Sequence, residues 1–136
     1  MGRTRFETLR VYQLAERLAD EIYAIVCRWP PLPRDTLGRQ MIRAADSIGA
    51  NIAEGCGRGT YQDNRRFVRI ARGSLNETKH WLRRAYGRKL LSDDDVNRLK
   101  PITDELAPRL NAYLRSIGSV APKGRATPDK PQTTDN

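Results

Sequence analysis

The side chains best placed to do chemistry are five cations and an asparagine that recur along one stretch of the chain. They fall at intervals of four, three, four, three and four residues: Arg65, Arg69, Arg72, Asn76, Lys79 and Arg83. In a helix this spacing places all six on one face, because 3.6 residues make a turn. A row of cations on a rigid rod can follow a row of phosphates, so the pattern favours contact with RNA or DNA. The alternative is a solvated helix surface with a few ion pairs.

Neighbouring residues extend this positive surface but give no means of reading bases. Arg84, Arg88 and Lys89 follow the row in the sequence. No aromatic side chains are interleaved with the cations, so base stacking and sequence-specific recognition are not predicted. The sequence therefore predicts non-specific binding, with these candidate contacts: Arg58, Arg65, Arg66, Arg69, Arg72, Lys79 and Arg83.

The glycine-rich segment at 55–59, Gly-Cys-Gly-Arg-Gly, precedes the cation row. Free amides at a helix start can hold a phosphate, and Arg58 would add a positive rim. However, the segment follows a predicted helix instead of a strand, and no Lys-Ser or Lys-Thr comes after it, unlike a nucleotide-binding P-loop. We therefore interpret it as a helix end and tight reversal, with Gly55 as a left-handed stop.

Polar residues beside this turn invite a catalytic interpretation that the sequence does not support. Glu54 has no second carboxylate, histidine or metal ligand at a supporting spacing. We expect Asn51 and Glu54 to bond a neighbouring helix, with Glu77 as the counterpart, so that both carboxylates face polar partners in the bundle or a subunit interface. The candidate structural motif comprises Asn51, Glu54, Gly55, Gly73, Ser74 and Glu77.

Metal and nucleophile chemistry also lack the necessary residues. The acids at 93–95 follow Ser92, which is typical of a capped first helical turn and less so of a magnesium site. His80 is the only histidine, and Cys27 and Cys56 form no Cys-x-x-Cys pair. We expect no catalytic residue, no metal ion, no cofactor and no enzymatic activity.

Four helices are predicted to position these groups. The first runs from Phe6 to Trp29, with one apolar face at Val11, Ala15, Leu18, Ile22, Ile25 and Trp29. The prolines at 30–33 end it, and Asp35 is the expected N-cap of the second helix. The second helix has its apolar face at Leu37, Met41, Ala45, Ile48 and Ile52, with small residues between them that allow close packing.

The third helix begins after Thr60, whose hydroxyl and Asp63 resemble a capping box. Its apolar residues span a wide arc: Phe67, Ile70, Ala71, Ser74, Thr78, Trp81 and Ala85, flanked by Val68, Leu75 and Leu82. That width indicates a second buried contact, with another subunit as one candidate. The fourth helix follows Ser92, with its apolar stripe at Val96, Leu99, Thr103, Leu106, Leu110, Tyr113 and Ile117. Pro101 and Pro108 predict a bend or a short break.

These segments predict an all-α, antiparallel up-down-up-down four-helix bundle over residues 1–118, followed by a disordered tail over 119–136. No apolar run approaches the roughly 20 residues of a membrane span, and the first residues lack a signal-peptide pattern, so we expect a cytoplasmic protein. The formal net charge of +9 favours polyanionic partners. Nucleic acid is the first candidate, and an acidic membrane surface or protein the second.

Three blocks of the sequence resemble those of a known family, the 23S rRNA intervening sequence proteins. The blocks lie at 40–48 (Gln-Met-Ile-Arg-Ala-Ala-Asp-Ser-Ile), at 51–58 (Asn-Ile-Ala-Glu-Gly, then Gly-Arg) and at 67–77 (Phe67, then Ala-Arg-Gly-Ser-Leu-Asn-Glu). The resemblance runs from about Phe6 to Leu114 and implies a four-helix bundle that assembles into a ring, with a pentamer expected. A more distant likeness is to the accessory protein of diversity-generating retroelements, a basic barrel that binds nucleic acid and a reverse transcriptase. Gly49, where many members carry proline, and the prolines of the last helix depart from the family pattern.

Two functions are consistent with these features. The first is a non-enzymatic, homo-oligomeric bundle that binds RNA or DNA without strong sequence preference. The second is a protein-interaction adaptor that docks an acidic partner such as a nucleic-acid enzyme.

Overall fold

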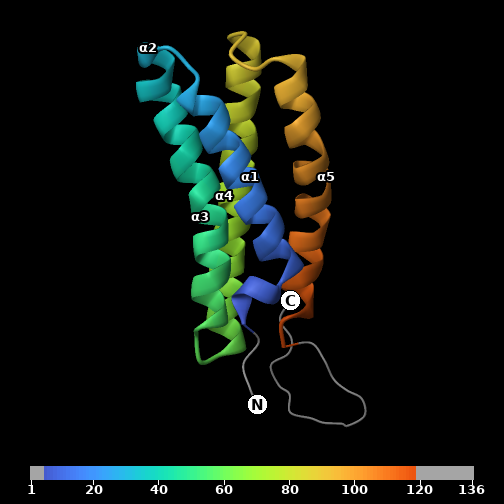
Figure 1. Cartoon of the computed structure of the whole chain (residues 1–136). Helices are drawn as coiled ribbons and strands as arrows, with labels where there is room; N and C mark the ends of the chain where they lie inside the picture. Colours follow the sequence, from blue (N-terminus) through green and yellow to red (C-terminus); the bar gives the residue numbers. More distant parts are fainter. Residues whose placement is uncertain (1–4, 119–136) are drawn as a thin grey trace.

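A computed structural model describes residues 5–118 of the chain and shows a bundle of four long helices (Figure 1). The helices are α1 (Arg10–Cys27), α3 (Arg39–Cys56), α4 (Tyr61–Gly87) and α5 (Asp93–Ser116), and a short 3-10 turn, η1 (Phe6–Thr8), precedes α1. The chain direction alternates from one long helix to the next, as Figure 1 shows. The predicted all-α antiparallel bundle is therefore confirmed. The predicted tail over 119–136 lies outside the described residues.

The core consists of one apolar stripe from each long helix. Leu14, Leu18 and Ile22 of α1 are fully buried, as are Ile48 of α3 and Leu106 of α5. Burying each such side chain contributes about 1.5–3 kcal/mol, so the stripes together hold the helices in place. The predicted inward faces of the first and second helices are confirmed throughout.

The second helix begins earlier than predicted. The segments α2 (Pro31–Pro33), η2 (Arg34–Gly38, a π-helical turn) and α3 follow one another without a break. Asp35 is therefore not an N-cap; it lies inside the π-helical turn and pairs with Arg34 at 3.1 Å. The reason is that a first helical turn needs no amide donors, so prolines are tolerated there and extend the helix backwards.

Close approach, and not backbone conformation, explains the glycine at the end of α3. Gly55 is buried inside the helix, which ends at Cys56 and has Gly57 as its C-cap with φ −86°. A Cβ on Gly55 would lie 2.5 Å from Asn64 Oδ1 and 3.2 Å from Phe67 Cβ of α4. The predicted left-handed stop at Gly55 is wrong, whereas the prediction that small residues allow neighbouring backbones to approach is confirmed.

The predicted starts of the last two helices are confirmed by their side-chain caps. The Asp63 amide donates to Thr60 Oγ1 at 3.1 Å, and Ser92 and Asp95 form a reciprocal capping box. Pro101 and Pro108 are exposed on α5, which continues through both without a break and is gently bowed in Figure 1. Prolines on the outer side of a helix are compatible with such curvature, because the helix curves around the core with its solvent side convex.

The wide apolar arc of α4 is only partly buried. Val68, Leu75 and Thr78 face the core, but Ile70 is 42% exposed.

Over the described residues, no helix is long and apolar enough to cross a membrane.

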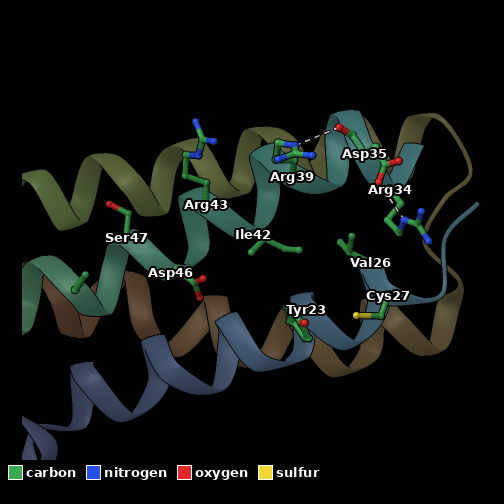
Figure 2. Close-up of a pocket in the computed structure, with 11 residues that line it drawn as sticks. Tyr23, Val26, Cys27, Arg34, Asp35, Arg39, Ile42, Arg43, Asp46 and Ser47 are labelled. Carbon is green, nitrogen blue, oxygen red and sulfur yellow. Dashed lines mark hydrogen bonds and ion pairs between the residues drawn. The ribbon is translucent and has the colours of Figure 1, made fainter. Parts of the chain in front are cut away.

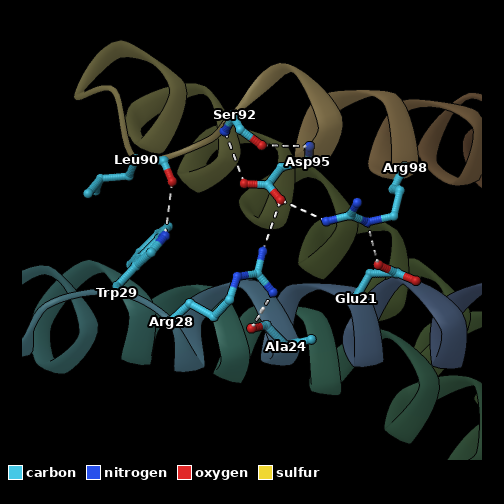
Figure 3. A network of polar contacts seen from close by, with 8 residues as sticks. All are labelled: Glu21, Ala24, Arg28, Trp29, Leu90, Ser92, Asp95 and Arg98. Atoms are coloured by element: carbon cyan, nitrogen blue, oxygen red, sulfur yellow. Dashed lines mark hydrogen bonds and ion pairs between the residues drawn. The ribbon is translucent and has the colours of Figure 1, made fainter.

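A polar network ties the end of α1 to the start of α5 (Figure 3). Asp95, only 5% exposed, accepts hydrogen bonds from Arg28 at 3.1 Å and from Arg98 at 2.8 Å. The indole of Trp29 donates to the Leu90 carbonyl at 3.0 Å. A buried carboxylate is stable only with such partners, so this network fixes the corner between α4 and α5 against α1.

Candidate nucleic-acid interface

The predicted cation row lies along α4 and borders α5. Arg65 Nη1 donates to the Ile117 carbonyl at 2.8 Å, and Arg72 Nη1 donates to Asn111 Oδ1 at 3.3 Å. These two arginines therefore link the N-terminal half of α4 to the last turns of α5. Their first role is to hold the fold, although Arg72 remains exposed.

Two further predicted contacts are engaged with acids near the turn that precedes α4. Arg58 pairs with Glu54 at 3.0 Å and with Asp63 at 3.6 Å, and Arg66 pairs with Asp63 at 3.5 Å. Both guanidinium groups also lie over the Phe67 ring, at 5.1 and 4.6 Å from its centre. The turn is therefore a partly neutralised surface, and a phosphate there would compete with these acids.

The remaining three predicted contacts are open. Arg69, Lys79 and Arg83 are exposed, and none of them lies within 4.0 Å of an acidic group belonging to residues 5–118. Arg84 and Arg88 continue this surface to the end of α4 and likewise have no acidic partner in the described part of the chain. We call Arg69, Lys79, Arg83, Arg84 and Arg88 the open cations. The structure thus divides the predicted row into cations that are engaged within the fold and three open ones, of which Lys79 and Arg83 lie in the C-terminal half of α4.

Ser74 of the candidate structural motif joins α4 to α3, whereas Asn51, which was expected to bond a neighbouring helix, bonds Ser47 of its own helix. The hydroxyls of Ser47 and Ser74 lie 3.0 Å apart, and the Asn51 amide donates to the Ser47 carbonyl at 2.8 Å and to its hydroxyl at 3.0 Å. The Thr78 hydroxyl donates to the Ser74 carbonyl at 2.8 Å. Small polar groups satisfy one another here, so the two backbones can approach without leaving unpaired atoms.

The two motif carboxylates find partners four residues further along the chain. Glu54 bonds Arg58, and Glu77 accepts a hydrogen bond from Trp81 Nε1 at 3.1 Å. Both acids are exposed, so the expected hydrogen bonds to a neighbouring helix of the bundle are not formed. Side chains four residues apart on a helix meet directly, so a carboxylate bonds this near neighbour instead of extending to the adjacent helix.

Gly73 has a different environment from Gly55. It is exposed in the middle of α4, and beyond its chain neighbours and the backbone of its own helix no atom of the described residues lies within 4 Å of the position that a Cβ would take. The packing of this chain therefore gives no reason for a glycine at this site.

Two features were not found by sequence reasoning. Cys56 Sγ lies 3.6 Å from the Tyr113 hydroxyl, and burial together with this contact raises the pKa of Tyr113. The second feature is a groove between α1 and α3. Neither has a signal in the spacing of residues, because each depends on how separate helices pack.

Among residues 5–118, no three His, Cys, Asp or Glu side chains gather in a way that could hold a metal ion.

Comparison with known proteins identifies a family and a solved structure of similar fold. The model of the family described as 23S rRNA-intervening sequence protein matches residues 7–112. A crystal structure from Bacteroides thetaiotaomicron VPI-5482, described as a protein with unknown function from the S23 ribosomal protein family, superimposes with a TM-score of 0.69. It is 21% identical and the match covers 78% of this chain and 99% of that one, so the likeness shows a shared fold. No curated protein matches the chain.

Proposed function

Since this chain belongs to the 23S rRNA-intervening sequence protein family, we propose that it is a non-enzymatic, homo-oligomeric bundle protein that binds RNA or DNA without strong sequence preference. The observation that carries the proposal is the surface of open cations on α4. Exposed arginines and lysines without acidic partners are available to phosphates, and binding there would release the counterions of the nucleic acid.

Two further properties of the surface support binding to the phosphate backbone. Four of the open cations lie on the single helix α4 and Arg88 is its C-cap, so their spacing is fixed before binding and little conformational entropy of the backbone is lost. The protein as a whole carries a formal net charge of +9, which attracts a polyanion over long range.

The test replaces open cations that take no part in folding. Arg69→Gln/Arg83→Gln should weaken binding to labelled RNA and DNA, and should flatten the slope of log K against log salt by roughly 2 units for duplex DNA. Arg65 and Arg72 are left intact because they contact α5. Replacing them could destabilise the fold, and a loss of folding could then be mistaken for a loss of binding.

The matched control removes the same charge elsewhere. Arg17 and Arg115 are exposed and have no acidic partner within 4.0 Å among residues 5–118. Arg17→Gln/Arg115→Gln should retain most of the binding. Equal losses in the two double variants would overturn the assignment to α4, and absence of binding by the unaltered protein at low salt would overturn the function.

Homo-oligomerisation is the second part of the proposal, with a pentameric ring as the expected form. Its support is the pair Ile70 and Gly73, which lie about one turn apart on α4 and are both exposed. A large apolar side chain beside a surface without a Cβ is suited to receive another helix. Light scattering at micromolar concentration checks the assembly, and a monomer there would contradict it.

A further inference from the structure

A groove of about 760 Å³ lies between α1 and α3 (Figure 2), and none of its lining residues belongs to α4. Figure 2 shows Val26 of α1 and Ile42 of α3 between the two helices. Tyr23 is 58% exposed and Cys27 is also exposed, so the α1 wall presents apolar surface to solvent. Val26 itself is buried, so the apolar surface that remains open is supplied by Tyr23 and the partly buried Ile42.

The shape of the groove suits a helix better than a small molecule. The wall formed by η2 and α3 extends from Arg34 to Ala50, which corresponds to roughly 24 Å at a helical rise of about 1.5 Å per residue. A small-molecule site usually encloses its ligand, whereas this groove is long and open. A partner helix of about 16 residues would match that length.

The charges along the groove indicate what such a helix should carry. Arg34 is paired with Asp35, but Arg39 bonds only the Asp35 carbonyl, at 3.4 Å, and Arg43 has no acidic group within 4.0 Å among the described residues. Figure 2 shows Arg39 and Arg43 along the α3 edge. Two unpaired guanidinium groups beside an apolar floor fit a helix whose apolar face is flanked by carboxylates.

The far end of the groove has the opposite character. Asp46 lies there, and burial and the nearby Asp20 carboxylate raise the pKa of Asp46. A cation on the partner would offset the repulsion from Asp20 and stabilise the charged form of Asp46. The groove therefore carries positive charge near Arg39 and negative charge near Asp46. This difference between its two ends would set the direction in which a helix binds.

We propose that this groove docks an amphipathic helix of an acidic protein partner. Apolar residues of that helix at positions i, i+3, i+4 and i+7 would cover Ile42 and Tyr23, and acids on its flank would pair with Arg39 and Arg43. This inference is independent of nucleic-acid binding, because it uses a different surface of the bundle.

The test uses the full-length protein and a synthetic 16-residue helical peptide with a leucine face and a glutamate flank. Fluorescence anisotropy should show saturable binding of this peptide, at least tenfold tighter than binding of a scrambled peptide of the same composition. Arg39→Glu/Arg43→Glu should weaken binding of the glutamate-flanked peptide at least tenfold and should strengthen binding of a lysine-flanked version. Tyr23→Ala, which removes an exposed ring, should weaken both.

Three results would overturn the proposal. Equal affinity for the ordered and scrambled peptides would show that charge alone accounts for peptide binding. A loss with Arg69→Gln/Arg83→Gln equal to that with Arg39→Glu/Arg43→Glu would place the peptide on α4. Dissociation of an oligomer by Tyr23→Ala would make a second copy of this chain the occupant.

Discussion

Lys89 has a backbone conformation that side chains rarely adopt. Its φ is +62°, and no other residue apart from glycine has a positive φ among residues 5–118. The Leu90 amide donates to the Ala85 carbonyl at 2.9 Å across it, which is the pattern of a helix end that usually contains glycine. A lysine here keeps a strained conformation beside the open cations, which is consistent with a role for its charge.

Replacing Lys89 with glycine should therefore stabilise the bundle. The strain of a left-handed side chain costs about 1 kcal/mol, so Lys89→Gly should raise the melting temperature by a few degrees. The same variant should bind RNA and DNA more weakly, because a cation is lost. Thermal denaturation followed by circular dichroism measures the first effect, and a lower melting temperature would contradict it.

Asp46 should be a destabilising carboxylate at neutral pH. Burial and Asp20 raise its pKa from the ordinary 3.8, so the folded protein binds this proton more tightly than the unfolded chain does. Stability is consequently lost as the pH rises from 3.8 through the raised folded pKa, and it is not regained above that value. Asp46→Asn should increase the urea midpoint at pH 7 and leave it nearly unchanged at pH 3. A decrease at pH 7 would show that Asp46 has a stabilising partner.

At the scale of elements, α1 and α5 are joined by a two-pronged ion pair. Arg10 Nε and Nη2 donate to the two oxygens of Glu105, each at 2.9 Å. The hydrogen bond with Arg10 lowers the pKa of Glu105. The contribution of the Glu105 carboxylate to stability is therefore complete at pH values above its ordinary pKa of 4.5. That contribution is lost as the pH falls through the lowered pKa of the folded state.

Glu105→Gln should accordingly lower the melting temperature at pH 7 and have little effect at the acid end of the titration. Added salt should reduce the difference at pH 7, because both groups are reached by solvent. Scanning calorimetry at two pH values and two salt concentrations separates these effects. A difference that persists at low pH would indicate a packing role and not an electrostatic one.

The helices and their inward faces were predictable because periodicity and capping are local properties. Thr60 and Ser92 cap the helices that they precede, as their neighbours in the sequence indicated. The errors at Asp35 and Gly55 arise where tertiary structure decides. Prolines became the first turn of a longer helix, and Gly55 is required by the nearness of Asn64.

The candidate site was predicted less completely than the fold. The spacing of the cations correctly placed them on α4, but it carried no information about which of them are engaged. Arg65 bonds a carbonyl 52 residues away in the sequence, and Arg72 bonds an amide 39 residues away. The groove was not predicted for the same reason, because its walls belong to two helices whose relative placement is a property of the packed bundle.

At the scale of the whole molecule, the exposed Gly73 connects the bundle to its proposed assembly. An exposed glycine inside a helix is about 1 kcal/mol less favourable than alanine, and nothing in the described chain needs its small size. Gly73→Ala should stabilise the isolated chain, whereas Gly73→Leu should fold equally well but weaken assembly if another copy packs here. Sedimentation of both variants measures this, and unchanged assembly of Gly73→Leu would place the subunit contact elsewhere.

The alternating direction of the four helices has a mechanical consequence. The start of α1 and the end of α5 lie at the same end of the bundle (Figure 1). A force that pulls these two points apart would peel α1 from α5 and load their contacts one after another instead of all together. The Arg10–Glu105 pair would be strained first and the buried Asp95 network at the far end last. The bundle should therefore open at low force from that end, with the corner between α4 and α5 as the last part to separate from α1.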